Sequence, residues 1–178
     1  MRADDIDARR QAGLNCAELI GIESVEFEDY PNLRLYQESL LGLTQKIEAR
    51  LDRWQLDIVY THHSSDTNID HRLVFDATLV AARPIPGKSI ASIRCFEIGS
   101  STDYSVPSLG HPFLPNLDLD VTQWMDTWFQ MVDFYGTEMR PAPFPRSKEV
   151  LAAGAILRGS EVGLARAEAF MEVRRIIK

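Results

Sequence analysis

Apolar and polar residues follow two periods along this chain, and each period predicts one kind of element. Apolar residues spaced as on one face of a helix predict helices over residues 4–20, 38–54, 70–82, 122–135 and 147–176. Alternating or continuously apolar runs predict strands over residues 25–28, 56–61, 90–100 and 117–121. Because the strands alternate with helices, the pattern predicts a three-layer α/β fold with a mostly parallel sheet.

The bulk properties of the chain narrow the class of protein. A chain of 178 residues can bury a core of its own, so we expect a single domain over residues 1–178. The net charge of −7 argues against a nucleic-acid or anionic-membrane partner, since either would select a basic surface. No apolar run could span a bilayer and no secretory signal opens the chain, so we expect a cytoplasmic protein. Cys16 and Cys95 are expected to be idle thiols rather than a disulfide.

The candidate chemistry lies in one segment, residues 60–84, which contains three of the four histidines. In this segment the predicted strand over residues 56–61 ends, and a helix begins near Asp70. The carboxyl edge of a strand is where open α/β sheets bind their ligands. Imidazole and carboxylate are also ligands that zinc prefers. The segment is therefore a candidate metal site.

His71 is the main candidate ligand, and the alternative is an ordinary surface or capping histidine. Its case depends on Asp66 and Asn68 in the same loop, although both residue types also suit a loop or a helix N-cap. His62 and His63 are adjacent at a strand end, so one side chain is expected to point inward and the other outward.

Other kinds of site find little support in the sequence. The chain has no G-x-S-x-G nucleophile turn, no G-x-G-x-x-G segment and no P-loop. The fourth histidine, His111, has no carboxylate close in sequence and is expected to be a loop residue. The histidine-rich segment is left as the best guide to function.

Residues 61–72 fit the pattern T-H-H-x-x-D-x-N-x-D-H-R, which resembles the second motif of the PIG-L (LmbE-like) zinc deacetylases. Further segments continue the similarity in the family's order: PNLRL at 31–35, AARP at 81–84, FEI at 96–98, MRP at 139–141, PRS at 145–147 and AEAF at 167–170. The resemblance implies a Rossmann-like fold and a zinc cofactor. It also implies an enzyme, a zinc-dependent amide hydrolase that removes the acetyl group from an N-acetyl amino sugar or its conjugate. Arg34 and Arg140 are expected to contact that substrate.

The same resemblance assigns roles within the histidine-rich loop. His71 is expected to bind the zinc ion, and Asp70 is expected to orient its ring. His63, Asp66 and Asn68 are expected to line the catalytic site. Many relatives have an oxyanion-stabilising histidine where this chain has Asn68, and an amide donates a hydrogen bond but transfers no proton. His63 is therefore expected to compensate.

One family motif has no counterpart in these residues. The strand ending in His-Pro-Asp-Asp-Glu, which supplies two zinc ligands and the general base, is not matched. We therefore expect the chain to begin after the family's first strand–helix–strand portion. One interpretation is an N-deacetylase completed by a missing N-terminal segment. A second is a catalytically silent or partner-requiring module, whose open sheet edge favours a homo-oligomer. A third is an unrelated α/β protein with a coincidental histidine loop.

Overall fold

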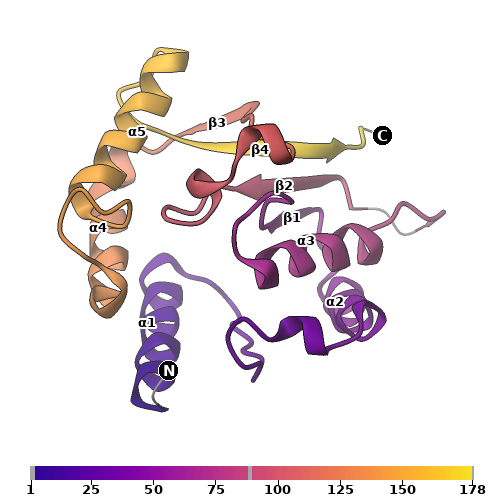
Figure 1. The fold of residues 1–178 in the computed structure, drawn as a ribbon. Coiled ribbons are helices and arrows are strands. Elements are labelled where there is room, and N and C mark those ends of the chain that lie inside the picture. Colours follow the sequence, from indigo (N-terminus) through magenta and orange to yellow (C-terminus); the bar gives the residue numbers. More distant parts are fainter. Residues whose placement is uncertain (1–2, 88–89, 178) are drawn as a thin grey trace. The chain divides into compact units, whose positions relative to one another are not determined.

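The computed structural model describes residues 3–87 and 90–177 (Figure 1). The helices are α1 (Ala3–Ile20), α2 (Leu40–Trp54), α3 (Ile69–Ala81), α4 (Met125–Phe134) and α5 (Lys148–Val162). The strands are β1 (Ile58–Thr61), β2 (Ser92–Phe96), β3 (Leu117–Asp120) and β4 (Ala167–Arg175). Contacts within the chain define a helical unit, residues 1–30 with 119–168, and a sheet unit, residues 31–118 with 169–178. The expectation of a single domain stays a prediction beside this division.

Most elements lie where the sequence pattern places them. The helices predicted at α1, α2, α3 and α4 are confirmed, as are the strands β1, β2 and β3. Local capping explains why α2 begins where it does, because the side chain of Ser39 accepts a hydrogen bond of 3.0 Å from the backbone N–H of Gly42. Gln55, in the left-handed conformation, ends that helix. The predicted strand over residues 25–28 is wrong, because that segment has no regular structure.

The last predicted helix is correct only as far as Val162. Gly163 follows it with φ 77°, a left-handed conformation that ends a helix at low cost. The chain then turns back over Gly159, where an added Cβ would lie 2.7 Å from the carbonyl oxygen of Leu164. The remaining residues form β4 and not the predicted helix. An apparent helical period over a glycine-containing stretch therefore concealed a strand.

The sheet has the strand order β1-β2-β4-β3. β1 pairs with β2 in parallel, from Ile58 opposite Ser92 to Thr61 opposite Cys95. β4 pairs with β2 in the antiparallel direction. Backbone hydrogen bonds from Asn116 to Phe170 and from Val121 to Arg166 run in the antiparallel sense between β3 and β4.

The α/β class is therefore confirmed, but the prediction of a mostly parallel sheet is wrong. Only β1 and β2 form a parallel pair in the part of the chain that the structure describes. The physical reason is the unforeseen strand β4, which inserts between β2 and β3 and runs against both. A prediction from alternating elements assumes one helical crossover before each strand, whereas two helices, α4 and α5, lie between β3 and β4.

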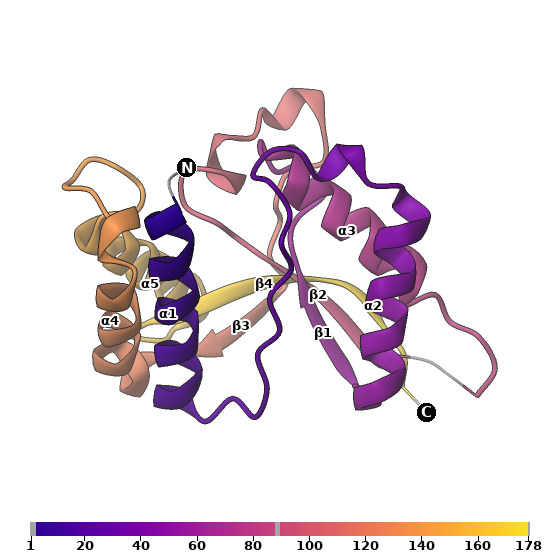
Figure 2. The same cartoon turned by 90° about the horizontal axis from the view of Figure 1, so that it is seen from below.

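In the sheet unit, α2 and α3 pack side by side on one face of β1 and β2 (Figure 2). The core between these elements contains Ala82, Ile90 and Ile93, and Ile93 has no exposed surface. Leu51 of α2 and Val59 of β1 pack against this cluster. The packing fixes α3 against the sheet, so its first turn lies at the carboxyl end of β1.

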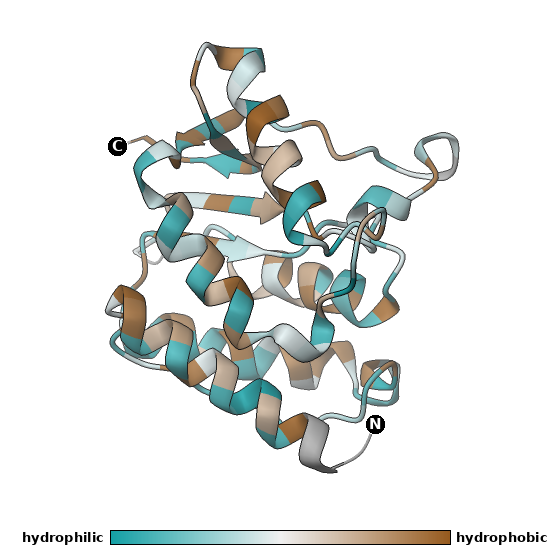
Figure 3. Ribbon diagram, turned by 90° about the vertical axis from the view of Figure 1, so that its left-hand side faces the viewer, coloured by the Kyte–Doolittle hydropathy of each residue, from teal (hydrophilic) through white to brown (hydrophobic). Residues whose placement is uncertain are grey.

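The helical unit contains α1, α4 and α5, and α1 packs along α4. Gly13 of α1 gives room to the rings of Phe27 and Tyr135, since a Cβ there would lie 3.3 Å from the first and 3.4 Å from the second. Apolar and polar residues are interleaved along the helices, as Figure 3 shows. Interleaving of this kind is typical of helices with one buried face.

Candidate functional site

The candidate site is built by the turn between β1 and α3. Asn68 is the N-cap of α3, and its Oδ1 accepts a hydrogen bond of 2.9 Å from the backbone N–H of Asp70. Asp66 precedes it, and Oδ1 of Asp66 accepts a hydrogen bond of 2.8 Å from the backbone N–H of Asn68. Both side chains satisfy N–H groups that the start of a helix leaves free. The turn is therefore ordered by these two hydrogen bonds, whatever the function of the site.

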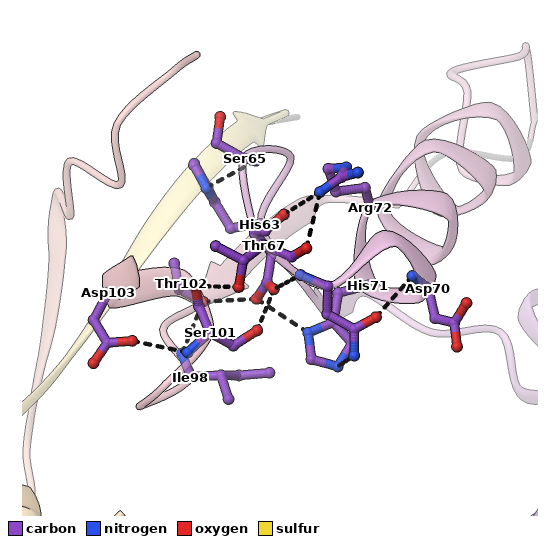
Figure 4. A network of polar contacts seen from close by, with 12 residues as sticks. His63, Ser65, Thr67, Asp70, His71, Arg72, Ile98, Ser101, Thr102 and Asp103 are labelled. Atoms are coloured by element: carbon purple, nitrogen blue, oxygen red, sulfur yellow. Dashed lines mark hydrogen bonds and ion pairs between the residues drawn. The ribbon is translucent and has the colours of Figure 1, made fainter. Parts of the chain in front are cut away.

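Asp66 is a buried carboxylate with several donors around it. Its neighbours Ser101, Thr102 and His71 are labelled in Figure 4. The hydroxyl of Thr102 donates to its Oδ2 at 2.9 Å, and the hydroxyl of Ser101 donates to its Oδ1. Nδ1 of His71 lies 3.0 Å from Oδ2. Burial alone would raise the pKa of Asp66, but the hydrogen bonds from His71, Ser101, Asn68 and Thr102 outweigh it and hold the pKa well below its usual range. The group is an anion under ordinary conditions.

His71 lies in the first turn of α3 with 22% of its side chain exposed. Its two ring nitrogens have different neighbours. Nδ1 faces the carboxylate of Asp66, and Nε2 lies 3.2 Å from Nδ2 of Asn68. The ring is thus held between two polar side chains of the preceding turn, and it is partly accessible.

His62 is a neighbour that the sequence did not single out. Its ring is stacked on that of His71, with centroids 4.1 Å apart and planes within 4°, and it also makes a T-shaped contact with the ring of Phe96. Burial, and then the nearby charge of His71, lower the pKa of His62 to about 4, against a weaker opposing effect of Asp66. Imidazole lone pairs lie in the ring plane, so two stacked rings do not direct them at one shared ion. His62 therefore covers a face of His71 without acting as its co-ligand.

His63 points the other way, as adjacent strand residues are expected to do. It is only 1% exposed, its Nδ1 accepts a hydrogen bond from the backbone N–H of Ser65 at 3.3 Å, and its ring meets the edge of Phe113. Burial lowers the pKa of His63, so the ring is kept neutral. The structure places it under the loop and not beside His71.

Asp70 has a different task from the expected one. Its carboxylate accepts backbone hydrogen bonds from Leu33 at 2.6 Å and from Leu35 at 3.0 Å. These bonds join the segment 33–35 to the start of α3. The sequence assigned Asp70 to orient His71, but the contact with the His71 ring is made by Asp66. The residue next to the histidine in sequence points away from the ring, and the one five positions earlier reaches it.

The other predicted residues lie in different places. Arg34 is exposed within the segment that Asp70 anchors, so it lies close to the start of α3. Arg140 belongs to the helical unit, where its guanidinium lies 5.1 Å from the ring centroid of Phe144. His111 is a loop residue whose backbone N–H donates to the hydroxyl of Ser65 at 2.9 Å.

Ser101 and Thr102 are partners that the sequence reasoning missed as part of the site. They follow β2, the parallel neighbour of β1. The carboxyl ends of parallel neighbours meet at one edge of a sheet, and this rule could have joined the two loops. The hydroxyl of Thr67 also donates to the carbonyl oxygen of Ser101 at 3.0 Å, so the two loops are tied by side chain and backbone.

Three further features of the described residues limit what the chain can hold. Within residues 3–87 and 90–177 no group of three or more His, Cys, Asp or Glu side chains is arranged to hold a metal ion. A pocket of about 340 Å³ lies elsewhere in the sheet unit, lined among others by Glu48, Asp57 and Arg83 and by no histidine. Among the described helices, none is both long enough and apolar enough to cross a membrane.

Comparison with known families identifies this arrangement. Residues 2–82 match the family described as PIG-L: GlcNAc-PI de-N-acetylase, and the match includes the loop that carries Asp66, Asn68 and His71. The resemblance to the PIG-L family is confirmed over these residues. The family's description is that of a deacetylase, which supports a deacetylase-like function at that level. The similarities noted beyond residue 82 stay predictions. Comparison with curated proteins gave no match.

Solved structures share the fold of this chain. The conserved protein TT1542 from Thermus thermophilus superposes with a TM-score of 0.73 at 17% identity, over 97% of this chain and 75% of that one. The N,N'-diacetylchitobiose deacetylase from Pyrococcus horikoshii gives 0.71 at 17% identity, over 94% of this chain. This chain spans 63% of that deacetylase's length.

GalB, the 4-carboxy-2-hydroxymuconate hydratase from Pseudomonas putida KT2440, also shares the fold, with a TM-score of 0.65 at 22% identity over 97% of this chain and 73% of that one. At these identities the likeness concerns the fold alone. A deacetylase and a hydratase are both built on it, so the reaction has to be argued from the residues of the site.

Proposed function

We propose that this chain takes part in zinc-dependent removal of the acetyl group from an N-acetylated amino sugar or a conjugate of one. One observation carries the proposal. His71 lies at the carboxyl end of β1, partly exposed, with Nδ1 3.0 Å from a buried carboxylate. A carboxylate on the inner ring nitrogen is typical of histidines that bind a metal ion through the other nitrogen. The family match includes this loop and supports the same reaction class.

The residues described do not fit a complete zinc centre. Catalytic zinc is normally held by three protein ligands, and the described residues contain no such group. His62 does not add a second ligand, because its ring is stacked on His71. No step of the reaction is therefore assigned to the metal. We propose instead that His71 is one ligand of a centre completed by further polypeptide, such as a second copy of the chain or another segment.

The side chains around His71 then have separate tasks. Asn68 has its oxygen engaged by the backbone of Asp70, so its amide N–H groups point to the Nε2 side of His71. From there they are suited to donate a hydrogen bond to a substrate oxygen, but not to move a proton. Arg34, on the anchored segment, is proposed to meet an anionic group of the conjugate. His63 and Arg140 receive no role beyond the sequence prediction.

The experiment separates the species by size before it assays them. The chain is purified with zinc, and each species is tested for bound metal and for acetate released from N,N'-diacetylchitobiose and from an N-acetylglucosaminyl inositol lipid. We expect zinc and acetate release only in an oligomer or complex, and loss of both in His71→Gln. His111→Gln, which alters an exposed loop histidine, is the matched control and should keep both. Acetate release that survives in His71→Gln, or in excess chelator, would refute the proposal.

A second candidate is a PIG-L module without turnover, which acts by binding other polypeptides. The absence of a three-ligand group among the described residues favours it. It predicts that no species of any size holds stoichiometric zinc or releases acetate. The same size-separated assay therefore decides between the two candidates.

A further inference from the structure

Asp66 connects the two loops that meet at the carboxyl ends of β1 and β2. Its oxygens receive the hydroxyls of Ser101 and Thr102 from the second loop and the backbone N–H of Asn68 from its own. Thr102 is itself held, because its Oγ1 accepts a hydrogen bond of 2.9 Å from the backbone N–H of Ile98. The carboxylate is completely buried. It is therefore a fixed acceptor whose position does not depend on His71.

The contacts of His71 are compatible with only one neutral form of the ring. Asp66 has no hydrogen to give, so the approach of 3.0 Å between its Oδ2 and Nδ1 is attractive only if Nδ1 carries the ring hydrogen. On the other side, the N-cap bond to Asp70 fixes Oδ1 of Asn68 and leaves its NH₂ group facing Nε2 at 3.2 Å. A donor there requires Nε2 to have a free lone pair. Both neighbours favour hydrogen on Nδ1.

We propose that Asp66 is the positioning residue that holds His71 with hydrogen on Nδ1 and leaves the Nε2 lone pair free to accept a hydrogen bond or to bind a ligand. Asp70, the neighbouring carboxylate, is excluded from the task because its oxygens are engaged by the backbone of Leu33 and Leu35. Asn68 supports the same form of the ring but does not determine it. The amide of Asn68 can move more easily than the carboxylate of Asp66, because that carboxylate is held by three other donors.

Asp66→Asn supplies a specific test, because it reverses the polarity at one oxygen without changing the shape. The side chain oxygen would stay toward the backbone N–H of Asn68, which cannot accept a hydrogen bond. The NH₂ group would then take the place of Oδ2 and face Nδ1 of His71. Nδ1 would become an acceptor, so the ring hydrogen would move to Nε2 and Nε2 would lose its free lone pair.

The experiment reads the ring directly by long-range ¹H–¹⁵N correlation NMR of the full chain, at about pH 8.5, where an ordinary histidine is neutral. The chain has only four histidines, and the His71 signals are those lost in His71→Gln. We expect a protonated Nδ1 and a bare Nε2 in the native chain, reversal in Asp66→Asn, and no reversal in Asp70→Asn. Hydrogen on Nε2 in the native chain, or no reversal in folded Asp66→Asn, would overturn the inference.

A second variant keeps the test decisive if Asp66→Asn does not fold. Asn68→Ala removes the other neighbour of the ring and a single cap, at a cost of about 1 kcal/mol. Hydrogen should stay on Nδ1 in this variant, and its transfer to Nε2 would show that Asn68 and not Asp66 sets the form of the ring. The measurement needs neither zinc nor substrate. Failure of acetate release would therefore remove the proposed function and leave the orientation of His71 by Asp66 standing.

Discussion

The acid sensitivity of this protein should be governed in part by His62. Burial, and then the nearby charge of His71, lower the pKa of His62 to about 4, from an ordinary value of 6.5. Between these two values the unfolded chain binds a proton that the folded chain does not. The free energy of unfolding should therefore fall as the pH drops from about 6.5 to about 4. The full difference corresponds to at most about 3 kcal/mol.

The matched variant is His62→Phe, which keeps a flat ring over His71 and removes the titration. The free energies of unfolding of both proteins are measured in urea, in the presence of chelator. Between pH 7 and pH 4 the native protein should lose up to about 3 kcal/mol more of this free energy than the variant. His63 titrates in the same direction, but it is present in both proteins and cancels. NMR titration of the native chain should give a His62 midpoint near 4. A midpoint at 6.5 or above, or a stability difference that is flat with pH, would refute the reasoning.

Three further predictions test other parts of the structure. Asp70→Ala should lower the free energy of unfolding by about 3 kcal/mol, because two charge-assisted hydrogen bonds to the segment 33–35 are lost. Amide hydrogen exchange in this segment should become faster, and unchanged exchange would contradict the role given to Asp70. Burial raises the pKa of the Cys95 thiol to about 12, so a thiol reagent at about pH 8 should modify Cys95 only after denaturation. Rapid modification of Cys95 in the native protein would contradict this prediction. Gly159→Ala should lower the melting temperature, because the added Cβ would meet backbone atoms at 2.7–2.9 Å. Gly154 lies in the same helix with open space around it, so Gly154→Ala should stabilise the protein by up to about 1 kcal/mol. Equal effects of the two substitutions on the melting temperature would refute the packing argument.

The candidate site was only partly predictable from the sequence. The turn residues were recognisable, since Asp66 and Asn68 stand before an apolar period and both types cap helices. Which carboxylate meets His71 was not, because sequence adjacency favoured Asp70. On a helix, adjacent side chains point about 100° apart, so the neighbour in sequence is directed elsewhere. His62 was passed over for a similar reason, since only the fold shows which of two adjacent histidines faces α3.

The sequence by itself determined most local elements from α1 to the end of α5, although not the segment 25–28, and it determined the motif that resembles the PIG-L family. These depend on short-range physics: periodicity, caps, and glycine in the left-handed conformation. Tertiary structure alone decided that residues 167–175 form a strand between β2 and β3, and that Ser101 and Thr102 enclose Asp66. Pairings of this kind join residues more than thirty positions apart, and no local pattern specifies them because their energy comes from the partner across the sheet or the loop.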